Sequence, residues 1–239
     1  MIRHRTFDAI VLDCDGVILD TNHAKTKAFA AIAASAGFNE SVVAPFAVWQ
    51  SQNFGVSRYR VFAALMSGQF GAPPVGVDQA SLLVDYGRAV DDIYATAPLT
   101  SGIEEFIEAF SQTRMFVVSG SEQSQLRRAL RDRKFADWFT EIYGSPSSKS
   151  ELLDHVLNHL ADVGLDQPKI LYFGDALADL EAARTHGFSF VGLRKYSASP
   201  QLLEDACVKF GFPCFESFVD YLSRNNVAPL GDAQMTSHD

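Results

Sequence analysis

Four short segments of this sequence follow apolar runs with residues whose types could do chemistry. In the first, Asp13 and Asp15 lie two positions apart after the run at 9–12 and are followed by Gly16. Carboxylates at positions i and i+2 of a strand point to the same face, so both could reach one ligand. Asp and Gly are also ordinary turn residues, and the pair alone would fit a polar turn equally well. The pair therefore gains meaning from the other three segments.

These other segments add a hydroxyl, a lysine and two further acids. They are Ser119-Gly120 after the run at 115–118, the loop at 144–149 that ends in Lys149, and Asp175 with Asp179 after the run at 169–173. Carboxylates prefer hard cations such as Mg²⁺. A hydroxyl, a lysine and the backbone N–H groups at a helix start suit phosphate. Together the segments indicate a site for a divalent metal and an anion.

Taken singly, each of these residues has a simpler interpretation. Ser119 could cap a helix, Lys149 could be a solvated surface charge, and Asp179 could cap a helix over 178–185. Cys14 between the two acids could suggest a thiol nucleophile. No basic loop follows it in the sequence, so we expect a filler position there.

The elements that must position the four segments are strands alternating with helices. Apolar runs predict strands at 9–12, 115–118, 139–143, 169–173, 188–193 and 212–215. This alternation predicts an α/β fold, with a parallel sheet, right-handed crossovers and helices on both faces. Because the carboxyl ends of parallel strands lie along one edge of the sheet, the four segments can converge there.

Local signals mark several of the helices. Ser101-x-x-Glu104 and Ser148-x-x-Glu151 have the capping-box pattern, so we expect a helix to begin at each. The long helix predicted over 78–96 would turn one apolar stripe inward, formed by Leu83, Tyr86, Val90 and Ile93.

The interval between Asp13 and Ser119 is much longer than the roughly 30 residues of one strand–helix–strand unit. Most of the surplus has helical periodicity, which predicts a helical domain inserted after the first strand. We therefore expect a catalytic core at 1–19 and 97–225, a helical cap domain at 20–96, and a poorly packed tail at 226–239.

Composition limits the class of protein. The chain has 239 residues, of which 47% are hydrophobic, and a formal net charge of −9. Such an acidic chain is a poor partner for nucleic acid or for an anionic membrane, so we expect neither. The sequence contains neither a membrane-spanning apolar stretch nor a signal peptide, which predicts a cytoplasmic protein, as a monomer or a weak homodimer. Its three cysteines lack the spacing of a zinc site or a disulfide framework.

In their order and position the four segments resemble the motifs of the haloacid dehalogenase superfamily, in its phosphatase branch with an inserted helical cap. The matching segments are Asp13-Cys14-Asp15-Gly16-Val17, Val118-Ser119-Gly120, Gly144-Ser145-Pro146-x-x-Lys149 and Gly174-Asp175-x-x-x-Asp179. The resemblance runs from residue 7 to about residue 220. It implies a Rossmann-like core and an enzyme that forms an aspartyl phosphate.

The resemblance also implies a role for each motif residue. Asp13 would be the nucleophile, and Asp15 would protonate the leaving oxygen and then activate water. Mg²⁺ would be held by the Asp13 carboxylate, the Asp15 backbone carbonyl and Asp175, with Asp179 as a ligand or as a support behind the ligands. The phosphoryl oxygens would be bound by Ser119, Gly120 and Lys149.

One loop of the predicted cap resembles the substrate loop of beta-phosphoglucomutases and related phosphatases. This loop is Phe54-Gly55-Val56-Ser57-Arg58. The resemblance implies that Gly55 and Arg58 contact the substrate, with Arg58 meeting a second anionic group. The match departs at Phe54, where the mutase pattern has a lysine. Arg58 could instead be an exposed residue in the first turn of a helix.

The cap would close over the site and exclude water. Linkers near 16–21 and 96–100 would join it to the core. Lys25 and Lys27, on the first helix of the cap, could face the cleft between the two domains. The contacts that discriminate between substrates would then come from the cap.

These expectations favour a Mg²⁺-dependent phosphatase whose partner is a small phosphate ester, such as a sugar phosphate or phosphoglycolate. One alternative is a phosphosugar mutase, which would return the phosphoryl group to its substrate. A second is a 2-haloacid dehalogenase, against which Asp15 argues because that branch has no acid at this position. A third is a non-catalytic binding module on the same fold.

Overall fold

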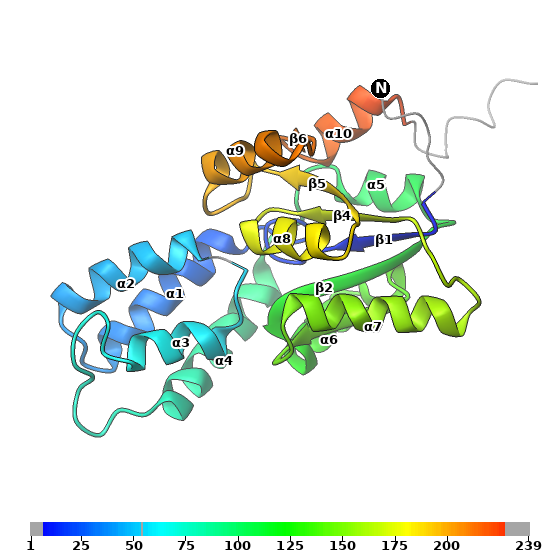
Figure 1. Cartoon of the computed structure of the whole chain (residues 1–239). Helices are drawn as coiled ribbons and strands as arrows, with labels where there is room; N and C mark the ends of the chain where they lie inside the picture. Colours follow the sequence, from blue (N-terminus) through cyan, green and yellow to red (C-terminus); the bar gives the residue numbers. More distant parts are fainter. Residues whose placement is uncertain (1–6, 54, 228–239) are drawn as a thin grey trace, which may run out of the picture.

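A six-stranded parallel sheet forms the centre of the computed structural model, which describes residues 7–53 and 55–227. Its strand order is β3-β2-β1-β4-β5-β6 (Figure 1). The strands are β1 (Ala9–Leu12), β2 (Arg114–Glu122), β3 (Glu141–Ser145), β4 (Ile170–Gly174), β5 (Ser189–Leu193) and β6 (Cys214–Phe215). Every neighbouring pair is parallel, which confirms the predicted α/β fold.

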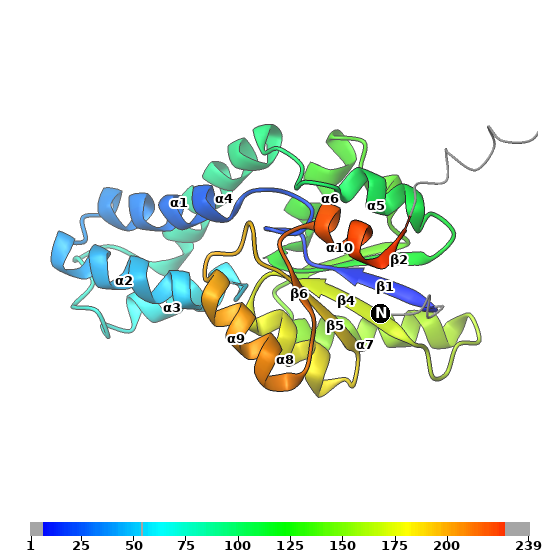
Figure 2. The ribbon, with the colours of Figure 1, turned by 90° about the horizontal axis from the view of Figure 1, so that it is seen from above.

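Helices cover both faces of the sheet, and the side chains of β1 show which helices cover each face. Side chains alternate between the two faces of a strand. Ile10 and Leu12 therefore pack with α5 (Ile103–Ala109), α6 (Gln123–Asp132) and α10 (Phe218–Asn225). Ala9 and Val11 pack with α7 (Lys149–Asp162), α8 (Leu177–Thr185) and α9 (Pro200–Phe210) on the opposite face (Figure 2). Since all four residues of β1 are fully buried, the sites at its end stand on a rigid strand.

Four of the helices between β1 and β2 lie together beyond the carboxyl end of β1 (Figure 1). They are α1 (Asn22–Ser35), α2 (Glu40–Gln52), α3 (Arg58–Met66) and α4 (Gln79–Thr96). The two chain segments that lead into and out of them run side by side: the N–H of Asp20 donates to Pro98, and the N–H of Thr100 donates to Ile18. The domain division at residues 20–96 stays a prediction. Of the predicted tail, residues 228–239 lie outside the described residues.

One of the two predicted capping boxes is present. The side chain of Ser148 accepts from the N–H of Glu151, and the side chain of Glu151 accepts from the N–H of Ser148. The prediction at Ser101 is wrong, because the N-cap of α5 is Gly102, whose φ is +86°. A Cβ at Gly102 would lie 2.5 Å from the backbone nitrogen of Val219, so close packing against α10 decides this helix start.

Helix α4 turns a different stripe inward from the one predicted. Its buried residues are Leu82, Tyr86, Val90 and Tyr94, at a strict spacing of four. Leu83 and Ile93 are only half-buried. The rotation matters for the site, because it brings the hydroxyl of Tyr94 toward the end of β1.

Among the residues that the structure describes, every helix is too short or too polar to cross a lipid bilayer. The three cysteines are free thiols; Cys14 and Cys207 are buried and Cys214 is half-buried.

Candidate active site

The carboxyl end of β1 gives its two aspartates different partners. Asp13 is 2% exposed; its Oδ1 accepts from the N–H of Cys14 at 2.7 Å, and its Oδ2 accepts from Lys149 Nζ at 2.9 Å. Asp15 is 6% exposed, and its Oδ2 accepts from Lys25 Nζ at 2.7 Å. Thus Asp13 pairs with a lysine of the sheet-covering helix α7, whereas Asp15 pairs with a lysine of α1.

Three carboxylates gather where β1 and β4 end. One oxygen from each of Asp13, Asp175 and Asp179 lies within 4.8 Å of the other two. Asp175 Oδ2 accepts from Asn22 Nδ2 at 2.5 Å, whereas Asp175 Oδ1 is buried without a hydrogen-bond partner among the described residues. Burial, together with repulsion from Asp13 and Asp179, raises the pKa of Asp175 well above its usual value.

This arrangement fits a hard divalent cation. A cation would offset the repulsion among the acids and would accept the free oxygen of Asp175 as a ligand. Gly16 lies against the same carboxylate with φ of +77°, and a Cβ there would clash with Asp175 Oδ2. Glycine at this position therefore leaves the acids room to converge.

Lys149 links the acid cluster to the start of α7. Its ammonium group donates to Asp13 and to Asp179, and both acids raise its pKa although burial opposes them. For Asp13, burial raises the pKa to about 7, against the lowering effect of Lys149. Asp179 also accepts from the hydroxyl of Tyr172 at 2.6 Å and from the N–H of Ala176 at 3.1 Å. Asp179 thus both caps α8 and orients the lysine.

Asp15 lies in a buried network that joins α1, α4 and β2. Its oxygens accept from Thr21 Oγ1 at 2.5 Å and Ser121 Oγ at 2.9 Å as well as from Lys25. Lys25 also donates to the hydroxyl of Tyr94 at 2.6 Å and to Ser121 Oγ at 2.7 Å. Burial tends to raise the pKa of Asp15, but Lys25 and the hydrogen bonds outweigh it, and the pKa is lowered. The free protein therefore holds Asp15 as a carboxylate.

The carboxyl-terminal part of β2, residues 119–122, approaches the α2–α3 loop closely. A Cβ at Gly120 would lie 2.6 Å from the backbone oxygen of Gly55, so glycine is required for this contact. Ser119 is fully buried, and its Oγ accepts from the N–H of Ser121 at 3.2 Å. Gly120 and Ser121 line a cavity beside Asp13, and the phosphate-binding role of Ser119 stays a prediction.

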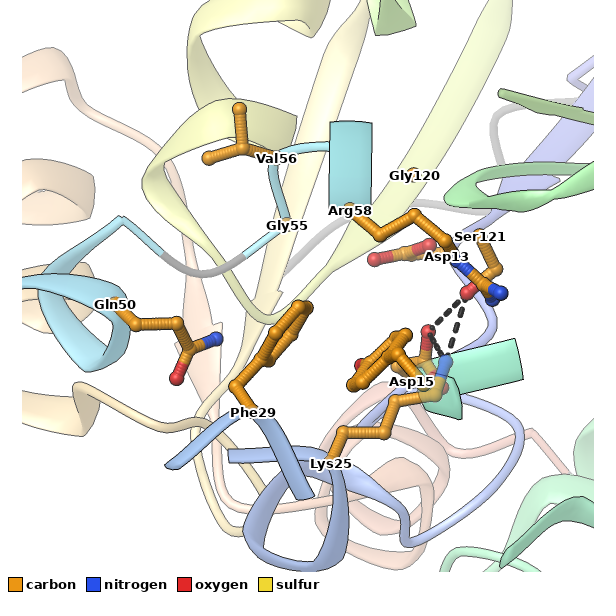
Figure 3. A pocket seen from close by; sticks show the side chains of 11 residues that line it. Asp13, Asp15, Lys25, Phe29, Gln50, Gly55, Val56, Arg58, Gly120 and Ser121 are labelled. Carbon is orange, nitrogen blue, oxygen red and sulfur yellow. Dashed lines mark hydrogen bonds and ion pairs between the residues drawn. The ribbon is translucent and has the colours of Figure 1, made fainter. Parts of the chain in front are cut away.

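That cavity, of about 30 Å³, lies between Asp13 and the helices α1–α4, and we call it the cap cavity. Figure 3 shows the residues around it. They are Asp13, Asp15, Lys25, Phe29, Gln50, Gly55, Val56, Arg58, Tyr86, Gly120 and Ser121. The ends of β1 and β2 thus line one side of this cavity, and the helices α1–α4 with the α2–α3 loop line the other side.

Both predicted substrate contacts of the cap loop border this cavity. Gly55 lies in it with φ of +86°. Arg58 is 7% exposed, so the alternative of an exposed residue is wrong. Its Nη2 donates to Gln125 Oε1 at 2.6 Å, and its guanidinium lies 5.0 Å from the ring centre of Tyr86. Phe54, where the loop departs from the mutase pattern, lies outside the described residues.

Several residues that build the site escaped the sequence reasoning. They are Thr21, Asn22, Gln50, Tyr94, Ser121 and Gln125. Most are isolated polar residues on helices, a pattern that a solvent-exposed helix face shares. Ser121 alone carried a local signal, because it lies two positions after Ser119 on the same side of the strand.

A family model for haloacid dehalogenase-like hydrolases matches residues 7–187. No curated protein matches the sequence. Many solved structures share the fold.

Three of these structures illustrate the likeness. A candidate phosphoglycolate phosphatase from Lactobacillus plantarum is 18% identical, with a TM-score of 0.67 over 92% of this chain and 99% of that one. YfnB from Bacillus subtilis, a candidate hydrolase of this family bound to magnesium, is 17% identical, with a TM-score of 0.64 over 93% and 100%. CbbY from Rhodobacter sphaeroides, a mutant in complex with xylulose-1,5-bisphosphate, is 17% identical, with a TM-score of 0.69 over 90% and 96%. At these identities the likeness shows the fold.

Proposed function

This chain belongs to the haloacid dehalogenase-like hydrolases, and we propose that it is a Mg²⁺-dependent phosphatase acting on a small organic phosphate monoester. One observation carries the proposal. A buried carboxylate, Asp13, borders the cap cavity, contacts Lys149 and lies within 4.8 Å of two further acids. A carboxylate held in this way can act as a nucleophile. A phosphate ester bound by cations beside it would be a suitable electrophile.

In the proposed reaction an oxygen of Asp13 attacks phosphorus, and the bond from phosphorus to the ester oxygen breaks. The leaving oxygen takes a proton from Asp15. Water then attacks the phosphorus of the aspartyl phosphate and gives a proton to Asp15. This second step restores the Asp13 carboxylate and releases inorganic phosphate.

The residues around the two acids have distinct tasks in this scheme. The N–H of Cys14 and the ammonium of Lys149 orient the Asp13 carboxylate. Asp13, the backbone carbonyl of Asp15 and Asp175 would hold Mg²⁺, with Asp179 beside them, and its charge would let an anionic carboxylate approach an anionic phosphate. Ser119, Gly120 and Lys149 would bind the phosphoryl oxygens.

Lys25 and its neighbours orient Asp15. The lowered pKa keeps this group in the carboxylate form, which accepts the proton of the attacking water in the second step. The first step uses the protonated form, which the approach of a phosphate dianion would favour because it adds negative charge beside the carboxylate. Asp15 would thus change its protonation state once in each half of the cycle.

The structural relatives support a phosphate ester as the substrate class. One is named for phosphoglycolate, and another was solved with a sugar bisphosphate. The relative bound to magnesium supports the choice of metal. The proposed partners are small phosphate esters, with neither nucleic acid nor membrane, and a cytoplasmic monomer or weak homodimer remains our prediction.

The test is release of inorganic phosphate by the purified full chain. We expect hydrolysis of p-nitrophenyl phosphate and of a panel of small esters with Mg²⁺, and loss of activity in excess EDTA. Asp13→Asn should abolish turnover and covalent labelling, and Asp15→Asn should abolish turnover. Asp132→Asn, at an exposed position, is the matched control.

Each alternative predicts a different result. A mutase would release little phosphate when no bisphosphate activator is present, because it returns the phosphoryl group to its substrate. A 2-haloacid dehalogenase would release halide, and a binding module would turn over none of the substrates. Full activity in EDTA, or near-native rates in Asp13→Asn, would refute the proposal.

A further inference from the structure

Two of the three cysteines lie together at the edge of the sheet, apart from the residues of the candidate active site. Cys207 lies near the end of α9, and Cys214 is the first residue of the edge strand β6. Helix α9 lies beside β6 in both views of the fold (Figure 1, Figure 2). Both cysteines belong to the hydrophobic cluster that α7, α8 and α9 form with the sheet. Cysteine spacing alone did not predict this pair.

The turn that ends α9 brings the two cysteines together. Gly211 has a φ of +74°, and the N–H of Phe212 donates to the carbonyl of Cys207 at 2.9 Å. This is the geometry of a Schellman turn, which ends a helix and turns the chain away from its axis. The chain then pairs with β5, where Cys214 lies opposite Gly192. Cys214 therefore enters the sheet where α9 covers it.

Gly192 leaves the space in which the two sulfur atoms meet. A Cβ at this position would lie 2.9 Å from Cys207 Sγ and 3.1 Å from Cys214 Sγ, so any larger residue would push against both. The thiol of Cys207 also forms a hydrogen bond with the sulfur of Cys214. Both sulfur atoms thus lie against one glycine and contact each other.

The two thiols differ in access and in acidity. Cys207 is fully buried, whereas Cys214 is half-buried. The hydrogen bond from Cys207 lowers the pKa of Cys214 although burial opposes it, and the same hydrogen bond, together with burial, raises the pKa of Cys207. Because the thiolate is the reactive form of cysteine, an oxidant from solvent should react first with Cys214.

The third cysteine lacks these properties. Cys14 lies at the end of β1, which β4 separates from β5 in the sheet. It is fully buried, and burial, together with the charge of Asp15, raises its pKa well above the usual value. Cys14 therefore serves as an internal reference for an unreactive thiol.

We propose that Cys207 and Cys214 are a site of reversible oxidation, at which a hydroperoxide converts the two thiols into an intramolecular disulfide. In the first step the Cys214 thiolate attacks one oxygen of the peroxide. The O–O bond breaks, and a sulfenic acid and a hydroxide or alkoxide ion form. In the second step Cys207 attacks the Cys214 sulfur, the S–S bond forms and the S–O bond breaks. The proton of Cys207 joins the departing hydroxide as water, so the protein loses two electrons and one peroxide is reduced.

The experiment treats the folded, fully reduced full chain with hydrogen peroxide and then removes the oxidant. Free thiols are counted in denaturant, and the disulfide is located by mass spectrometry of unreduced peptides. We expect the count to fall from three thiols to one, with Cys207 linked to Cys214 and Cys14 still free. Dithiothreitol should restore all three thiols, because a disulfide is reversible whereas sulfinic and sulfonic acids are not.

Three variants assign the order of the steps. In Cys207→Ser, Cys214 should stop at the sulfenic acid, which dimedone traps. In Cys214→Ser, Cys207 should remain a thiol, because the accessible partner is missing. Cys14→Ser is the matched control and should form the same disulfide as the wild type. The count and the peptide map of the wild type stand even if one of these variants fails to fold.

Four results would overturn the proposal. They are three free thiols after treatment of the folded protein, a disulfide that contains Cys14, a disulfide between two chains, and a Cys207–Cys214 disulfide that forms only in urea. Equal labelling of Cys207 by dimedone in Cys214→Ser would refute the assigned order. None of these measurements depends on phosphate release, so the inference and the proposed function can fail independently.

Discussion

Replacing Lys25 with methionine should strongly destabilise the folded protein. The ammonium group is buried, with 3% of the residue exposed, and donates to Asp15, Tyr94 and Ser121 at 2.6–2.7 Å. Methionine keeps most of the apolar stem and removes the charge, which leaves the Asp15 carboxylate buried beside two hydroxyls. Removing one partner of a buried ion pair typically costs about 3–5 kcal/mol in the free energy of unfolding.

The loss should depend on pH in a defined direction. In the wild type the pKa of Asp15 is lowered, so its contribution to stability is present above the unfolded value of 3.8 and is lost as the pH falls through the folded value. In Lys25→Met, burial is no longer opposed by the ion pair, and the folded pKa rises above 3.8. Protonation then relieves the buried charge in the variant. The difference between the two proteins should therefore be largest at pH 7 and shrink toward pH 4.

Urea unfolding of both proteins at pH 7 and at pH 4.5 measures this difference. Lys27→Met is the matched control, because Lys27 lies on the same helix and is exposed, and it should change stability by less than about 0.5 kcal/mol. A loss below about 1 kcal/mol at pH 7, or a difference that stays constant between the two pH values, would refute this reasoning.

Two further predictions concern the acid cluster. Lys149→Met removes the cation between Asp13 and Asp179, so added Mg²⁺ should raise the melting temperature of this variant more than that of the wild type; a smaller shift would contradict the assignment. Gly16→Ala should abolish both the Mg²⁺-induced shift and phosphate release, because its Cβ would clash with Asp175. Gly164→Ala is the control: its φ of +84° imposes the same backbone strain, but its Cβ would meet no atom within 4 Å. If Gly16→Ala and Gly164→Ala had equal effects, the loss of the Mg²⁺-induced shift and of phosphate release would be due to backbone strain alone.

Much of the core of this protein is encoded locally. The buried run at 9–12 predicts β1, and its place in an alternation of strands and helices predicts a parallel sheet. The capping box at Ser148 predicts the start of α7, which carries Lys149. Motif residues at strand ends must meet at one sheet edge, so the proximity of Asp13 to Asp175 could be expected. All of these follow from patterns within about ten residues and from one rule of topology.

Local patterns failed where another element set the conformation. Helix α5 begins after Gly102 because α10 packs against it, which the capping-box pattern at Ser101 does not contain. The buried stripe of α4 includes Tyr94, whose hydroxyl forms hydrogen bonds with buried polar atoms. Apolar periodicity does not contain this contact, and it therefore predicted Ile93 as the buried residue. In both cases the deciding contact comes from a distant part of the chain.

The network around Asp15 was decided by tertiary structure alone. Lys25 meets Tyr94 across 69 positions of sequence and Ser121 across 96. Gln50 and Arg58 likewise border the cavity of Asp13 because α2 and α3 pack over the sheet edge. The sequence determines which groups are present and which strand or helix carries each one. Their partners depend on how the helices rest on the sheet, because burying a charge or an amide is tolerable only where packing brings a complementary group within reach.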